Sequence, residues 1–286
     1  MPIRLAPIAV ATALVAPLAW AMPAAADSTT LKAVVFDDVK PLYLKTDAGY
    51  AGLGVDVLEQ IRMQARRRKV EYTSAKSVKD GLNAVITGKA DIACGVAFTW
   101  ERSTQLSYTL PFGVGGTRLL TAGDTSVDGT PASLSDKTVG VVKDSASAKV
   151  LKSVVPGITL KAYDTPAQAL AAFNGGDVPI LGGGTLWLAA NSSPDTTALL
   201  PLRPYGRSGI GCIVSQNNGR LLSKANLAIG QMMQAYMDGD AGTRHMVERW
   251  IGPDSNVGLS REAIRSLYGL ILTVTAELST TVTPAR

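Results

Sequence analysis

The chain has 286 residues, of which 46% are hydrophobic and 18% are charged, a composition typical of a folded globular protein. Its formal net charge is +5, and leaving out Arg4 of the N-terminal segment reduces it to +4, a mild charge that argues against nucleic acid as a partner. With one histidine and two cysteines, the chain lacks the residues for a structural zinc site, and no cofactor is expected.

The first 26 residues have the pattern of an export signal. Arg4 is their only charged residue, an apolar stretch covers 5–20, and Ala24-Ala25-Ala26 fits the small residues of a cleavage site. The apolar stretch is short for a membrane span of about 20 residues, and an uncleaved anchor is the alternative. We therefore predict a periplasmic or extracellular protein that is exported through a cleaved signal peptide.

Strand and helix patterns alternate after this segment. Apolar or alternating stretches at 32–36, 70–73 and 90–94 have the pattern of strands, and apolar residues recur with helical spacing at 55–63 and 78–86. Alternation of this kind predicts a mostly parallel sheet with helices on its faces.

The alternation restarts after a glycine-rich strand pattern at 115–121. Two α/β units joined by a crossover strand predict two lobes with a cleft between them, and a cleft of this kind is a common site for a small molecule. The second unit has strand patterns at 138–142, 158–163 and 178–181, and helix patterns at 145–154 and 166–173, which Ser145 and Pro166 are suited to begin.

The C-terminal part has a strand pattern at 209–214 and helix patterns at 225–238, 244–251 and 260–278. The apolar part of the last helix is too short to span a membrane. We expect residues 253–286 to form an extension, a helix and a polar tail, which either covers the neighbouring lobe or offers a docking surface.

Three segments carry a family resemblance: GYAGLGVDVLEQI, GKADIACGVAFTWERSTQLSYTLPF and DKTVGVVKDSASAKVLK, in this order. Together with the C-terminal helices they resemble the bacterial extracellular solute-binding proteins of family 3, which are type II periplasmic binding proteins related to the ligand-binding core of ionotropic glutamate receptors. The resemblance covers about 31–252. It implies a two-lobed α/β fold with two crossover strands that closes on a small ligand, most often an amino acid.

Mapped onto this chain, the resemblance implies lobe 1 at 27–111 and 210–252, and lobe 2 at 117–204. Family members bind a small-molecule solute and present it to the membrane subunits of an ABC importer or to a receptor, and we expect this chain to act as a monomer. The stretch around Arg102 also resembles orphan members of the family, which lack a transporter of their own.

The resemblance assigns the main ligand contact of lobe 1 to Arg102. In the family, the arginine of the T-x-x-R motif binds the ligand carboxylate in a bidentate manner, because a planar guanidinium makes two parallel hydrogen bonds to one carboxylate. Thr99 begins this motif here, and Gly95 stands where a backbone group usually assists. Ala97 replaces the usual assisting hydroxyl, so one carboxylate bond is absent or replaced.

Lobe 2 departs further from the family. Lys143 and Ser145 stand where the family places a helix N-terminus that binds the ligand, and Ser145 is suited both to cap the helix and to contact the ligand. The stretch 178–184 lacks the acid that usually pairs with a ligand ammonium, for which Asp37 or Asp38 is the candidate substitute. An unpaired buried ammonium costs several kcal/mol, so we expect an anionic ligand without an α-amine, or an apolar one. Aromatic candidates for the pocket wall, each also suited to the core, are Tyr43, Phe98, Trp100, Tyr108 and Trp187.

Cys94 and Cys212 lie on strands that the family places side by side. An exported protein meets an oxidising compartment, which favours one disulfide, and two buried thiols are the alternative.

Three classes of function fit these residues: a solute-binding protein for ABC import or sensing, a binding-like scaffold that engages a protein or an exported peptide, and a dehydratase-type enzyme on the same fold. Catalysis requires a general acid or base in the cleft, and the single histidine, His245, falls in a C-terminal helix away from it. We therefore predict a solute-binding protein rather than an enzyme.

Expression in a Gram-negative host tests the predicted signal. We expect the exported chain to begin at Asp27, because the small residues Ala24 to Ala26 precede it. Intact-mass measurement of the exported protein reads this N-terminus directly. Recovery of the full-length chain from the membrane fraction would support the uncleaved anchor instead.

Overall fold

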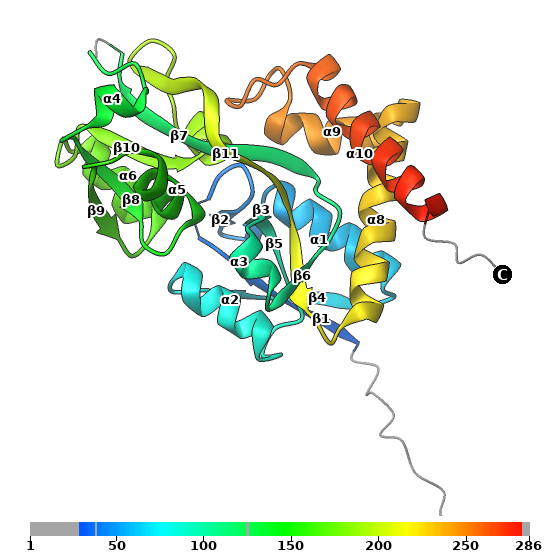
Figure 1. The fold of residues 1–286 in the computed structure, drawn as a ribbon. Helices are drawn as coiled ribbons and strands as arrows, with labels where there is room; N and C mark the ends of the chain where they lie inside the picture. Colours follow the sequence, from blue (N-terminus) through cyan, green and yellow to red (C-terminus); the bar gives the residue numbers. More distant parts are fainter. Residues whose placement is uncertain (1–28, 38, 124–125, 282–286) are drawn as a thin grey trace, which may run out of the picture.

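The computed structural model describes residues 29–37, 39–123 and 126–281 (Figure 1), so the predicted signal peptide and Asp38 lie outside the described residues. Figure 1 shows two groups of elements, lobe 1 and lobe 2, joined by two long strands. The long strands are β7 (Gly113–Ala122) and β11 (Thr197–Ser215), which pair antiparallel with each other.

Lobe 1 contains a parallel sheet of three strands, in which β1 pairs with both β4 and β5. The three strands are β1 (Thr30–Val35), β4 (Lys69–Ser74) and β5 (Ile92–Ala97). Lobe 1 also has the short strand β6 (Leu106–Tyr108), which pairs with β11, and a separate hairpin of β2 (Leu44–Thr46) and β3 (Gly49–Ala51). Its helices in the N-terminal half are α1 (Leu53–Gln64), α2 (Val78–Ile86) and α3 (Trp100–Ser103).

Lobe 2 repeats the parallel arrangement, with β8 between β9 and β10. Its elements are α4 (Pro131–Leu134), β8 (Thr138–Val142), α5 (Ala146–Val154), β9 (Thr159–Tyr163), α6 (Pro166–Asn174), β10 (Ile180–Gly184) and α7 (Thr185–Ala190). Local sequence sets the helix starts, since the Ser145 hydroxyl accepts a hydrogen bond from the Ala148 amide and Thr165 forms a capping box with Gln168.

The sheet is continuous through both lobes, in the order β4-β1-β5-β11-β7-β10-β8-β9. The parallel sheets predicted from the alternation are present, and the antiparallel strands β7 and β11 join them. β11 pairs with β5 in lobe 1 and with β7 along the path to lobe 2, so one strand of 19 residues belongs to both halves.

Three C-terminal helices complete the molecule: α8 (Gly219–Asp238), α9 (Ala241–Ile251) and α10 (Arg261–Thr281). Ile264 and Tyr268 of α10 are buried in the core of lobe 1, and the Tyr268 hydroxyl donates to the Phe112 carbonyl oxygen at 3.4 Å. The loop before α10 also reaches lobe 2, where the Asn256 side chain donates to the Ala190 carbonyl oxygen at 3.3 Å. The extension therefore packs on lobe 1 and contacts lobe 2.

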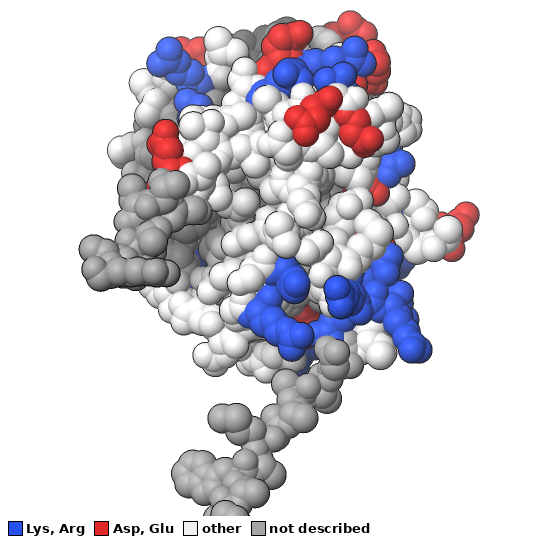
Figure 2. All heavy atoms as spheres, turned by 90° about the vertical axis from the view of Figure 1, so that its right-hand side faces the viewer, with Lys and Arg blue, Asp and Glu red and all other residues white. Residues whose placement is uncertain are grey.

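Figure 2 shows the face that includes the C-terminal helices, on which Lys and Arg gather at the lower end and side chains of both signs lie near the top. None of the described helices is both long enough and apolar enough to cross a membrane.

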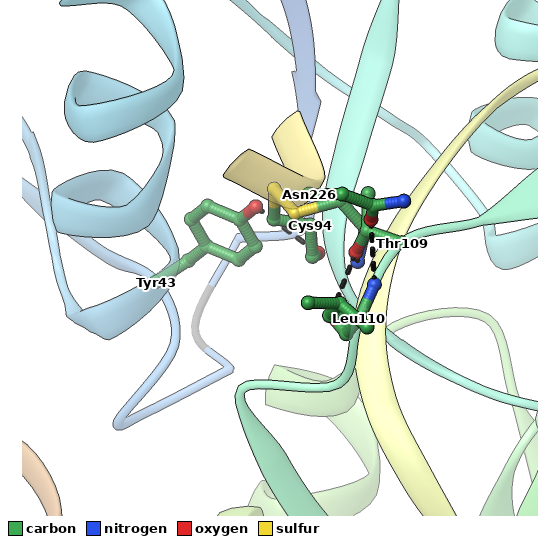
Figure 3. Close-up of a disulfide and its surroundings, with 6 residues drawn as sticks. Tyr43, Cys94, Thr109, Leu110 and Asn226 are labelled. Atoms are coloured by element: carbon green, nitrogen blue, oxygen red, sulfur yellow. Dashed lines mark hydrogen bonds between the residues drawn. A yellow bond between two sulfur atoms is a disulfide. The ribbon is translucent and has the colours of Figure 1, made fainter. Parts of the chain in front are cut away.

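A disulfide joins Cys94 of β5 to Cys212 of β11, and both residues are fully buried (Figure 3). The bonds around it tie neighbouring segments together. The Thr109 hydroxyl accepts from the Cys212 amide at 2.8 Å, and the Leu110 amide donates to the Asn226 side chain at 2.8 Å.

Replacing both cysteines by alanine should lower the free energy of unfolding by about 3–5 kcal/mol, because the bridge closes a long loop in the unfolded chain. The two cysteines are 118 residues apart in sequence. Urea unfolding of the double variant Cys94→Ala/Cys212→Ala and of the parent, with and without reductant, measures the difference. Two thiols that react with an alkylating agent in the unreduced, unfolded parent would contradict the bridge.

Candidate ligand-binding site

A cavity of about 530 Å³ lies between the two lobes, a volume within the range of small-molecule sites. We call it the interlobe cavity. Its lobe 1 wall consists of segments that follow β1, β4 and β5, and its lobe 2 wall of segments that follow β8, β9 and β10. The carboxyl ends of parallel strands meet at one edge of each sheet, which is why these segments converge.

Arg102 lies in the lobe 1 wall, on the short helix α3. The Thr99 hydroxyl begins this helix by accepting from the Arg102 amide at 3.2 Å, so Thr99, also in the wall, positions the arginine. The guanidinium donates to the Ala97 carbonyl oxygen at 3.1 Å, which the Tyr108 hydroxyl also contacts, at 3.0 Å. Arg102 forms no ion pair with any acid among the described residues.

Gly95 allows β5 and the loop after β1 to pack closely against each other. Its φ is +76°, and a Cβ atom there would lie 2.8 Å from the Leu42 side chain, so glycine is required. Tyr43 on the same loop is 1% exposed and donates from its hydroxyl to the Cys94 carbonyl oxygen at 3.1 Å (Figure 3). Burial raises the pKa of Tyr43 well above its usual value, so the phenol stays neutral and supports the wall.

Ser145 lies in the lobe 2 wall, together with Ala146 and Ser147 of the first turn of α5. Its hydroxyl caps the helix, accepting from the Ala148 amide at 3.1 Å. The N-terminus of α6, with Thr165 and Pro166, lies in the same wall. Two helix N-termini therefore face the interlobe cavity, and their dipoles favour anionic groups.

Among the described residues, the acids of the wall are Asp37, which is a candidate from the sequence, and Asp164, which the sequence patterns did not indicate. Asp37 accepts from the Tyr50 hydroxyl at 2.9 Å, and Asp164 lies 3.9 Å from the ammonium of Lys143. A second missed residue is Lys76, a cation of the lobe 1 wall. The available signal was position, because Lys76 and Asp164 each closely follow a predicted strand, at its carboxyl end.

Gly183, near the end of β10 in the lobe 2 wall, has no room for a side chain. A Cβ atom at Gly183 would lie 2.6 Å from two atoms of the Trp187 ring, so the indole occupies the space that a side chain would need. Trp187 is buried and lines the interlobe cavity. Backbone and indole therefore form this part of the wall.

The structure does not bring Lys143, Trp100 or Tyr108 into the lining of the interlobe cavity. Lys143 is directed to its partner Asp164. Trp100 is 82% exposed, because it begins α3 on the outer side and packs only its ring edge against Phe98, with centroids 5.0 Å apart. Phe98, in contrast, lines the cavity.

The two lobes are in contact across the cavity mouth. The Lys149 ammonium of α5 donates to both carboxylate oxygens of Glu101 on α3, at 2.7 and 2.5 Å. Val39 and Val78 of lobe 1 pack against an apolar cluster of lobe 2 that includes Trp187. The described conformation is therefore a closed one.

A two-lobed α/β fold with a ligand-sized cavity between its lobes defines the class of two-lobed periplasmic binding proteins. Residues 31–252 match the bacterial extracellular solute-binding proteins, family 3, and the chain belongs to this family. The family and the fold predicted from the sequence are thus confirmed, and the protein is a solute-binding protein.

Solved structures of amino-acid-binding proteins share the fold at low sequence identity. An ancestral arginine-binding protein bound to glutamine has a TM-score of 0.69 and 23% identity, covering 78% of this chain and 98% of its own. AncCDT-1, an ancestral amino-acid-binding protein described as a precursor of cyclohexadienyl dehydratase, has a TM-score of 0.69 and 21% identity, covering 78% and 96%. AbpA from Streptococcus pneumoniae, an amino acid ABC transporter substrate-binding protein bound to L-arginine, has a TM-score of 0.68 and 16% identity, covering 77% and 93%.

A curated relative is the virulence sensor protein BvgS of Bordetella pertussis, 24% identical over 146 residues. The match covers 51% of this chain and only 12% of BvgS.

The Glu101–Lys149 ion pair predicts a measurable effect on lobe closure. Lys149 lowers the pKa of Glu101 below its ordinary value of 4.5, so the pair stabilises the closed form above that value and loses its effect as the pH falls through the lowered pKa. At neutral pH and low salt, Lys149→Gln should therefore increase the radius of gyration measured by small-angle X-ray scattering. Lys152→Gln on the same helix is the control, and high salt should abolish the difference. An unchanged radius for Lys149→Gln would contradict a role in closure.

Proposed function

We propose that this protein is an extracytoplasmic binding protein that closes its two lobes on a small carboxylate-bearing solute, for ABC import or for sensing. The observation that carries the proposal is Arg102, a cation in the wall of the interlobe cavity without an acidic partner among the described residues. A guanidinium in the wall of a cavity favours an anion that accepts two hydrogen bonds, and a carboxylate has this geometry.

The mechanism is a population shift between open and closed forms. Solute held by Arg102 in lobe 1 and by the start of α5 in lobe 2 contacts both walls only when the lobes are closed, so binding stabilises the closed form. The closed form then presents a surface, composed of both lobes, that a membrane partner distinguishes from the open one.

The partner is either the membrane part of an ABC importer or a receptor. Similarity to AbpA supports import, and similarity to BvgS supports sensing. Both roles place the protein outside the cytoplasm, in agreement with the export signal expected at its N-terminus.

A catalytic role is not proposed, although AncCDT-1 is described as a precursor of a dehydratase. The acids in the wall, Asp37 and Asp164, are each engaged by a partner, and His245 lies on α9, which does not line the interlobe cavity. These contacts support a site for holding a solute rather than for transferring its protons.

A thermal-shift screen of organic acids, amino acids and amines tests the proposal. A carboxylate present at about a hundredfold over its Kd should stabilise the protein by about 2.7 kcal/mol, which appears as a raised Tm. Arg102→Ala should abolish this shift, whereas Trp100→Ala, on the same helix but outside the cavity wall, should retain it. A screen in which no carboxylate raises the Tm, or a shift that survives Arg102→Ala, would overturn the proposal.

A further inference from the structure

The wall of the interlobe cavity contains two cations, Arg102 and Lys76, that form no ion pair with an acid in the part of the chain that the structure describes. Lys76 lies in the segment that follows β4, its side chain is exposed, and it forms no ion pair within the described part of the chain. Arg102 is bound only to groups without a full charge, since its guanidinium donates to the Ala97 carbonyl oxygen and lies beside the Tyr108 hydroxyl. The lobe 1 wall therefore carries two cations that form no ion pair with a carboxylate of the residues the structure describes.

The acids of the cavity are already engaged, and by groups that do not line it. Tyr50 donates to Asp37, and Lys143 pairs with Asp164. Neither Tyr50 nor Lys143 belongs to the cavity wall. Each acid thus has a partner that lies outside the cavity wall, although the uncharged Tyr50 hydroxyl does not neutralise Asp37. Arg102 and Lys76, in contrast, form no ion pair with an acid of the described residues.

We infer that the solute carries two anionic groups, one bound by Arg102 and the other within reach of Lys76, which makes it a dicarboxylate. This inference rests on the proposed function and names its substrate class. A zwitterionic amino acid with a single carboxylate would supply an anion to only one of the two cations. The lobe 2 wall adds the N-termini of α5 and α6, which also favour anionic groups.

Sheet geometry indicates the spacing of the two groups. In the strand order, β4 and β5 lie on either side of β1, and neighbouring strands are about 4.8 Å apart, so the segments that carry Lys76 and Arg102 start about 10 Å apart. The flexible lysine side chain shortens this gap. A short aliphatic spacer between the two carboxylates fits this arrangement.

Calorimetry with pairs of acids of equal carbon number tests the inference: succinate against butanoate, glutarate against pentanoate, and adipate against hexanoate. In the parent protein, at least one dicarboxylate should bind at least about tenfold more tightly than its monocarboxylate partner, because a charge-assisted hydrogen bond is added. Lys76→Gln should bring the two affinities of that pair together, by lowering the affinity for the dicarboxylate more than the affinity for the monocarboxylate. Lys79→Gln, three residues away and outside the cavity wall, should preserve the preference.

The variants distinguish failure of this inference from failure of the proposed function. Equal affinity for both members of every pair, or an equal loss for both in Lys76→Gln, overturns the dicarboxylate assignment, and Arg102→Gln then shows whether a carboxylate site exists at all. If Arg102→Gln leaves all affinities unchanged, or if none of the acids binds, both proposals are overturned. The Tm of each unliganded variant, compared with the parent, identifies any loss that comes from unfolding.

Discussion

The structure depends on the pairing of one long strand. β11 pairs antiparallel with β5 of lobe 1 and then with β7, the strand that leads into lobe 2, and the Cys94–Cys212 disulfide joins it covalently to β5. Because β5 leads directly into the segment with Thr99 and Arg102, the strand that connects the lobes also holds the strand that presents the cation. Pairing with β11 therefore contributes both to the connection between the lobes and to the position of Arg102.

The charged side chains of the interlobe cavity come from both lobes. At Gly183 of β10, the Trp187 indole occupies the space that a side chain would need. Asp37 and Asp164 are present but engaged from outside the cavity. Arg102 and Lys76 of the cavity wall form no ion pair with an acid of the described residues, and two helix N-termini lie in the opposite wall. The proposed anionic solute would interact with these groups, and mostly apolar surroundings strengthen such an attraction.

The C-terminal extension adds a feature beyond the region that matches the family. It follows residue 252, buries Tyr268 against lobe 1 and reaches Ala190 of lobe 2 through Asn256. It thus contacts the first lobe through apolar burial and the second through a single polar bond. That asymmetry is consistent with a segment that stays on lobe 1 while lobe 2 moves.

Prediction from the sequence was reliable where the signal is periodic or carries a motif. The α/β alternation, the helix started by Ser145 and the family's T-x-x-R motif are local patterns. The structure contains a parallel set of strands in each lobe, the helix α5 after Ser145, and Arg102 in the cavity wall. Short elements were missed, such as α3 with four residues and β6 with three, because they are too short to show a period. Trp100 and Lys143 were placed at the site from sequence position alone, and the direction of their side chains excludes them from the cavity wall.

The sequence by itself determined the family, the alternation of strands and helices, and the presence of an arginine after an apolar strand. Each of these features depends on residues that are close together in the sequence. Only the tertiary structure decided which charges remain unpaired in the cavity. Lys76, Asp164 and Arg102 are far apart in the chain, and their pairing depends on how the strand ends of two lobes converge and on which partners reach them from outside. Electrostatic balance is a property of distances in space, and these distances are not encoded in any single stretch of the sequence.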